Sequence, residues 1–238
     1  MTTNKIIKPI LASLIVGLAC SAGAADAAKS EYNYVGVRAG LVTPSTLQGN
    51  SDLKSVAPDT AYTAGIAFGR QLTERFGAEV EYTYRGKSYI NSNSIINTAN
   101  GTVNSSNDWA VSSNTFMVNA IANLLEGQHM VMPYLKAGMG LSDNKSYDYV
   151  YNSNNRIETW SGKSKSTFAW QAAFGLNLAT SNMIDTNFEY AYIDRGKFET
   201  QGDGKVSYAN GEKDTIPNTA KTGHLREQVV TIGFKVKF

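Results

Sequence analysis

Few side chains in this sequence have the chemistry of an active site. There are two histidines, His129 and His224, and a single cysteine, Cys20. A nucleophilic triad needs a histidine within hydrogen-bond reach of a serine and of a carboxylate, but the strand pattern described below puts the two histidines at opposite ends of the fold. The sequence has no zinc-ligand spacing and no phosphate-binding loop. We therefore predict a protein that is not an enzyme and that holds no metal or cofactor.

Charged residues that alternate with apolar ones are a more informative group. Glu79 and Glu81 are two positions apart on one predicted strand, where arginine or lysine partners suit them better than an acid–base role. The predicted inward-facing charges have mixed signs and are Arg38, Glu79, Glu81, Lys136, Asp185, Glu189, Glu227 and Lys235. An unpaired buried charge costs several kcal/mol, so we expect these side chains to pair across the interior. The prediction is a salt-bridged plug; the alternative is a narrow polar conduit.

The elements that must position these charges are strands. Near the end of the chain, apolar and polar residues alternate strictly, and one face carries Val230, Ile232, Phe234, Val236 and Phe238. Seven further segments have the same character: 35–41, 62–72, 76–85, 116–125, 133–141, 168–178 and 184–192. A tilted membrane strand needs roughly 9–11 residues, and an even number of strands allows closure. The predicted fold class is all-β: an eight-stranded antiparallel up-and-down transmembrane β-barrel, closed between its first and last strands.

The predicted connections alternate in length. Short turns fall around 73–75, 127–129 and 180–182, whereas the other connections are long and polar and cover about 43–60, 86–113, 142–166 and 196–224. Short periplasmic turns that alternate with long outer loops are typical of outer-membrane barrels. The Asn- and Ser-rich stretch from 91 to 113 indicates a mobile polar segment. The alternating tyrosines around Tyr149 indicate that the neighbouring strands continue above the membrane as a hairpin.

Residues 1–28 have the pattern of a secretory signal peptide. Lys5 and Lys8 precede a short apolar run, and small residues then offer cleavage points near 24–28. The run is too short to cross a bilayer core of about 30 Å as a helix. We predict that residues 29–238 are exported and form a barrel in the outer membrane of a bacterium. The near balance of 22 basic and 20 acidic residues provides no concentrated basic face for nucleic acid.

Several short motifs on these strands together resemble those of a known family. They are Tyr34-Val35-Gly36-Val37-Arg38-Ala39-Gly40, Met117-Val118-Asn119, Pro133-Tyr134-Leu135-Lys136-Ala137-Gly138-Met139-Gly140, Phe168-Ala169-Trp170-Gln171, Tyr192-Ile193-Asp194-Arg195-Gly196 and the final Phe238. In order and spacing the chain resembles, over about residues 31–238, the opacity-type small barrels related to outer membrane protein A. The resemblance implies an eight-stranded barrel with antigenic surface loops. It also implies that Phe238 is part of the signal read by the barrel assembly machinery, in addition to anchoring the strand in lipid.

The predicted outer loops carry aromatic residues that suit protein contacts. They are Trp109, Tyr147, Tyr149, Tyr151, Trp160 and Tyr208. Exposed tyrosine and tryptophan rings supply much contact area, so a host surface protein is one expected partner. The alternative is that these rings belong to the upper aromatic girdle or to the extended hairpin. The other expected partners are outer-membrane lipid, lipopolysaccharide and the barrel assembly machinery.

Three functions remain open from the sequence. The leading hypothesis is a non-enzymatic surface barrel that displays its loops as an adhesin or host-interaction antigen. A channel for small solutes or hydrophobic compounds is the second, and a purely structural envelope protein is the third.

Overall fold

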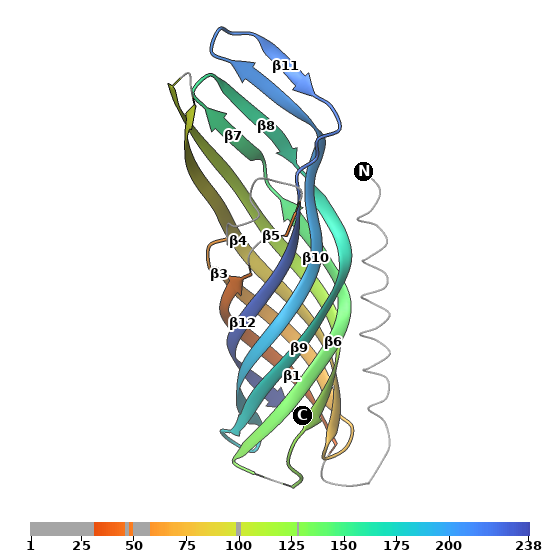
Figure 1. Cartoon of the computed structure of the whole chain (residues 1–238). Helices are drawn as coiled ribbons and strands as arrows, with labels where there is room; N and C mark the ends of the chain where they lie inside the picture. The colour runs from red at the N-terminus through yellow and green to blue at the C-terminus, as the bar shows by residue number, and fades with distance from the viewer. Residues whose placement is uncertain (1–30, 46–47, 50–57, 99–100, 128) are drawn as a thin grey trace. The chain divides into compact units, whose positions relative to one another are not determined.

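Antiparallel strands make up nearly all of the chain that the computed structural model describes, namely residues 31–45, 48–49, 58–98, 101–127 and 129–238 (Figure 1). They belong to the unit Glu31–Phe238. Within the described residues, no helix is long and apolar enough to span a membrane. The predicted signal peptide, residues 1–28, lies outside the described part of the chain.

Eight strands close into a ring. In their order around it they are β1 (Tyr32–Pro44), β3 (Ala61–Gln71), β4 (Phe76–Thr98), β5 (Gly101–Asn123), β6 (Val131–Ser146), β9 (Ser164–Ala179), β10 (Ile184–Tyr208) and β12 (Thr222–Lys237). Each strand pairs antiparallel with the next, and β12 pairs with both β10 and β1. Closure pairs the backbone groups that hydrocarbon cannot hydrate. The predicted eight-stranded antiparallel barrel is confirmed.

The faces of the ring alternate as a membrane barrel requires. On β1, Val37 and Leu41 are 52% and 62% exposed, whereas the intervening Arg38 is buried. The same alternation around the ring leaves an outward-facing set of large apolar side chains, here called the apolar belt: Val35, Val37, Leu41, Tyr62, Ile66, Phe76, Tyr82, Val118, Leu135, Met139, Leu141, Phe168, Phe174, Phe188, Tyr190, Val230, Ile232 and Phe234. Such a belt suits the hydrocarbon of a bilayer.

Short turns join the strands at one end of the ring, here called the lower end. The turn before β4 is held by Thr73, whose hydroxyl accepts a hydrogen bond from the Phe76 amide at 3.0 Å. Ser181 accepts one from the Ile184 amide at 3.0 Å in the turn before β10. The start of β1 and the end of β12 also meet at the lower end, where the Phe238 amide donates a hydrogen bond to the Asn33 carbonyl at 2.9 Å. These turns lie where the sequence predicts them.

The long connections differ from the prediction. Strands β4 and β5 have 23 residues each and β10 has 25, far more than the roughly 9–11 needed to cross a membrane. Strands β4 and β5 stay in register up to the pair Thr98 and Gly101. Of the predicted mobile segment at 91–113, residues 91–98 and 101–113 are therefore strand, because even a polar sequence pairs where its backbone groups meet those of a partner strand. The described residues of 86–113, 142–166 and 196–224 are called the outer extension.

Short strands complete the outer extension. Strands β7 (Tyr149–Ser153) and β8 (Arg156–Gly162) form a hairpin, and β11 (Lys213–Ile216) pairs with the end of β10. The predicted hairpin around Tyr149 is thus present. However, β7 pairs with β5 and β8 pairs with β10, so the hairpin is not simply a continuation of β6 and β9. Of the predicted loop 43–60, strand β2 (Gln48–Gly49) pairs with β12, and residues 46–47 and 50–57 lie outside the described part.

A bulge in β10 depends on a glycine. The register with β12 shifts between Asp194 and Gly196, and Gly196 has a φ of 76°. A Cβ at this position would lie 2.4 Å from the Thr167 hydroxyl. We expect Gly196→Ala to lower the free energy of unfolding by more than about 1 kcal/mol, because the substitution combines left-handed strain with a steric clash.

Urea unfolding of the purified protein in lipid vesicles measures this effect. Gly202→Ala is the matched control, because a Cβ at Gly202 meets nothing within 4 Å. Equal unfolding midpoints for the two variants would contradict a structural role for the bulge.

Candidate functional site

An ion-pair network fills the lower half of the barrel. Arg38 Nη2 lies 2.9 Å from Glu79 Oε1, and Arg38 Nη1 lies 3.1 Å from Glu81 Oε1 and 3.4 Å from Glu189 Oε1. Lys136 Nζ lies 3.2 Å from Glu81 Oε2 and 2.6 Å from Glu189 Oε1. These five residues and Lys235 are called the lower charge cluster. All six are buried inward-facing residues that the sequence predicts as part of the network.

Neutral polar side chains hold the carboxylates in place. Tyr34 donates its phenol hydrogen to Glu79 Oε2 at 2.9 Å, and Tyr134 donates to Glu189 Oε2 at 2.8 Å. Asn119 Nδ2 and Gln171 Nε2 donate to Glu81 Oε2 at 2.9 Å and 3.0 Å. The sequence prediction omits these four residues because it considers only charged side chains. All four lie at inward-facing positions of the predicted strands, and this alternation is the pattern from which they could have been predicted.

The signs within the lower charge cluster cancel. Arg38, Lys136 and Lys235 carry three positive charges against three carboxylates. The Lys235 ammonium lies 5.0 Å from the ring centroids of both Tyr34 and Tyr134. Each buried charge therefore has compensation close by, which is the condition under which buried ion pairs are tolerated.

Two of the predicted lumen charges lie elsewhere. Asp185 pairs with Lys237 Nζ at 2.8 Å, close to the lower end. Glu227 lies higher and pairs with Arg195 Nε at 2.7 Å and with Arg85. Arg85, Arg195 and Glu227 are fully buried and are called the upper charge cluster. The sequence prediction includes Glu227 alone and misses both arginines.

The alternation of the strands predicts that both arginines face the lumen, but register shifts in β4 and β10 set where their side chains lie. Arg85 continues the inward face of Glu79 and Glu81 on β4, immediately before a register shift between Arg85 and Ser88. Arg195 lies inside the bulge of β10. Bulges commonly re-aim a side chain, and here both arginines are directed at one carboxylate.

Apolar layers separate and cover the charge clusters. Between the two clusters lie buried apolar side chains, here called the middle layer: Val42, Ala61, Met117, Ala169, Ala173, Ala191, Ile193 and Val229. Beyond the upper cluster lies a second set, here called the aromatic plug: Ile90, Trp109, Val111, Tyr149, Trp160, Phe198 and Leu225. The order along β10 shows the layering, since Glu189 is followed by Ile193, then Arg195, then Phe198.

The aromatic plug gives the outer extension a core of its own. The Trp109 ring centroid lies 4.8 Å from that of Phe198 and 5.5 Å from that of Tyr149, which in turn lies 5.4 Å from Trp160. The polar tips are satisfied, because Trp109 Nε1 donates to Ser146 Oγ at 2.8 Å and Tyr149 donates to Asn107 Oδ1 at 2.6 Å. Rings at these spacings stabilise a core beyond their buried area.

This arrangement corrects the predicted loop contacts. Trp109, Tyr149 and Trp160 are only 2%, 2% and 1% exposed, so the expectation that they face solvent is wrong. They turn inward because the strands continue above the membrane and enclose an interior that needs filling. Tyr151 is partly buried against the same plug.

Two of the predicted contact residues remain accessible. Tyr147 is partly buried beneath the Lys87 ammonium, which lies 4.0 Å from its ring centroid. Tyr208 is exposed at the end of β10.

The outer surface just above the apolar belt carries further ion pairs. Glu199 lies 2.8 Å from Lys163 Nζ and also pairs with Lys165. Hydrogen bonds from these two lysines lower the pKa of the Glu199 carboxyl below its ordinary value. Asp194 pairs with His224 Nε2 at 2.6 Å and with Arg226 Nε at 3.2 Å.

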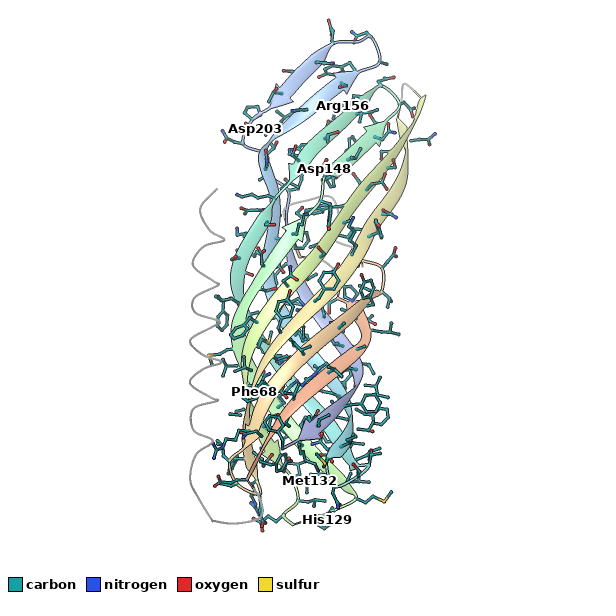
Figure 2. All side chains as sticks on the ribbon, turned by 180° about the vertical axis from the view of Figure 1, so that it is seen from behind. Phe68, His129, Met132, Asp148, Arg156 and Asp203 are labelled. Carbon is teal, nitrogen blue, oxygen red and sulfur yellow. The ribbon has the colours of Figure 1, made fainter. Side chains whose placement is uncertain are left out.

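The histidines take no part in a common site. His129 lies in a lower turn, where its Nε2 is 2.8 Å from the Glu126 carbonyl oxygen, and His224 contacts Asp194 at the upper side. Figure 2 shows His129 and Met132 at the opposite end of the barrel from Arg156 and Asp203. Within the described residues, no group of three histidine, cysteine or acidic side chains is placed to hold a metal ion.

Known proteins are similar to this chain in sequence. A family model described as "Outer membrane protein beta-barrel domain" matches residues 12–238. Outer membrane protein PagN of Salmonella typhimurium is 26% identical over 199 residues, which cover 78% of this chain and 77% of PagN.

Solved structures align with most of this chain. Neisserial surface protein A has a TM-score of 0.51 at 16% identity, over 87% of this chain and 97% of that structure. The outer membrane protease OmpT of Escherichia coli has a TM-score of 0.47 at 11% identity, over 88% of this chain and 98% of that structure. The family match spans most of the sequence and agrees with the closed ring and the apolar belt. The chain therefore belongs to the outer membrane protein β-barrel family and is a bacterial outer-membrane protein.

Proposed function

We propose that this protein is a non-enzymatic surface barrel whose outer extension binds a host surface protein, as an adhesin or host-interaction antigen. The observation that carries the proposal is the aromatic plug. It gives the segments above the apolar belt a packed interior, so that their outward residues are presented on a stiff scaffold rather than on loose loops. A preorganised surface loses less conformational freedom on binding and therefore binds more tightly.

The far end of the outer extension is the proposed contact surface. Arg156 on β8 and Tyr208 on β10 are exposed there and are called the distal tip; Figure 2 labels Arg156. Tyr208 pairs in register with Arg156, so their side chains project from the same face of the sheet, and Tyr208 is 37% exposed. An aromatic and an arginine side chain close together on one face are a composition enriched where partners bind.

Attachment of bacterial cells to host cells tests the proposal. We expect the double substitution Arg156→Ser and Tyr208→Ser to reduce attachment at least tenfold relative to wild type at equal surface level. Lys197→Ser, an exposed position on β10 closer to the belt, is the control and keeps wild-type attachment. Unchanged attachment of the double variant, with heat-dependent gel mobility showing a folded barrel, would exclude the distal tip as the contact surface.

The lumen supports a closed barrel rather than the alternative channel. Two charge clusters and two apolar layers occupy successive levels of the interior, and an eight-stranded barrel encloses a space about wide enough for side chains alone. We expect purified, folded protein in a planar bilayer to give no stable single-channel steps. Reproducible unitary conductance in wild type that is lost after heat denaturation would instead favour the channel.

The proposal also includes contacts with the barrel assembly machinery, with lipopolysaccharide and with outer-membrane lipid. Phe238 is 64% exposed at the lower end, where a terminal aromatic is accessible to the barrel assembly machinery during insertion. Lys145 and Lys165 lie on the adjacent strands β6 and β9, and Lys163 lies immediately before β9. All three are above the apolar belt, at a level where they suit the phosphates of lipopolysaccharide and other outer-membrane lipid.

A further inference from the structure

The upper charge cluster carries more positive than negative charge. Arg85 and Arg195 face the single carboxylate of Glu227, and all three side chains are fully buried. In the lower charge cluster, by contrast, three cations meet three carboxylates. A guanidinium stays protonated in proteins, so the excess of one charge is not removed by deprotonation. An uncompensated charge in a buried setting costs several kcal/mol.

The surroundings of the upper charge cluster do not supply the missing negative charge. Arg85 Nη1 donates to the Val111 carbonyl oxygen at 3.0 Å, and Arg195 Nη1 donates to the Thr115 hydroxyl. The middle layer lies on one side of the cluster and the aromatic plug on the other. Among the described residues, Glu227 is the one carboxylate within ion-pair distance of either guanidinium.

Two nitrogen atoms identify where a compensating group would bind. Arg85 Nη2 and Arg195 Nη2 are buried and have no hydrogen-bond partner among the residues that the structure describes. Because both arginines contact the two oxygens of one carboxylate, their guanidinium groups flank the same point in the lumen. A water molecule would satisfy these hydrogen bonds but would leave the charge uncompensated.

We propose that a small monovalent anion of the halide class binds inside the barrel at the Nη2 atoms of Arg85 and Arg195. A single negative charge neutralises the cluster and accepts one N–H from each of the two Nη2 atoms, as charge-assisted hydrogen bonds. The site is a structural one: it stabilises the junction between the membrane-spanning ring and the outer extension, and it does not depend on what the distal tip binds.

Unfolding at varied chloride and constant ionic strength tests the proposal. Sodium gluconate replaces sodium chloride while urea unfolding is followed in lipid vesicles. For one site on the folded state, each tenfold increase of chloride above its dissociation constant raises the folded-to-unfolded ratio about tenfold. We expect this dependence in the wild type and in the control Lys205→Met, which removes an exposed lysine of β10.

Arg195→Met is the decisive variant. It leaves Arg85 and Glu227 as a balanced pair, so we expect the chloride dependence to disappear. A dependence that persists in Arg195→Met, or that is missing in the wild type, would overturn the proposal.

Crystals of the wild type soaked in sodium bromide provide a second test that needs no substitution. We expect an anomalous bromide peak within hydrogen-bond distance of both Nη2 atoms. If Arg195→Met does not fold, this experiment decides alone, and a map with no peak at the upper charge cluster rejects the anion site.

Discussion

Replacing Arg38 with methionine is expected to lower the free energy of unfolding by about 3–5 kcal/mol. Arg38 is the cation that contacts all three carboxylates of the lower charge cluster. Without it, three buried carboxylates share Lys136 and Lys235, so that one negative charge is left uncompensated where water cannot hydrate it. Urea unfolding in lipid vesicles, followed by tryptophan fluorescence, measures the loss.

Arg75→Met is the matched control for the Arg38 substitution. Arg75 also forms an ion pair, with Glu126 at 2.5 Å, but both of these side chains are more than half exposed. Exposed pairs contribute about 0–1 kcal/mol, so this variant is expected to stay close to wild type. If the two variants lost similar free energies of unfolding, burial would not be the reason why the lower charge cluster stabilises the protein.

Replacing Trp109 with alanine is expected to cost about 3–5 kcal/mol, the range for removing a large aromatic side chain from a packed core. Trp109 contacts both Phe198 and Tyr149 and donates a hydrogen bond to Ser146, so its loss removes the centre of the aromatic plug. The effect should concentrate in the outer extension, because the ring below is held by its own backbone pairing.

Hydrogen exchange of backbone amides distinguishes local from global destabilisation. In Trp109→Ala we expect faster exchange in β7, β8 and the upper part of β10, with little change in the membrane-spanning part of the ring. Tyr208→Ala, which removes an exposed ring, is the control and should alter stability by no more than about 0.5 kcal/mol. Unchanged protection of β7 and β8 in Trp109→Ala would mean that the plug does not hold the outer extension together.

The lumen-facing residues illustrate how much of the site could be predicted. Side chains of a strand alternate between two faces, so the outward position of Val37 already assigns Arg38 to the interior. This local rule is enough to identify the members of the lower charge cluster. It does not identify their partners, since Arg38 and Glu189 are 151 positions apart and are brought to 3.4 Å only by closure and tilt of the ring.

The outer extension shows where prediction fails. Above the apolar belt there is no hydrocarbon, so an outward residue need not be apolar and an inward one need not be polar. Trp109 and Trp160 in a polar segment are therefore compatible with an exposed contact surface and with a buried core alike. The structure decides for the core, because β7 and β8 bridge β5 and β10 and enclose the rings.

The sequence by itself determined the number of strands in the ring, their inward and outward faces and the members of the lower charge cluster, since all of these depend on a period of two and on the apolar belt. Only the tertiary structure decided that the long connections are strands with an aromatic core. It also decided that Arg85 and Arg195 meet at Glu227, because bulges in β4 and β10 change the register locally. Pairing across a closed ring depends on register and shear, which join residues far apart in the chain and leave no local pattern in the sequence.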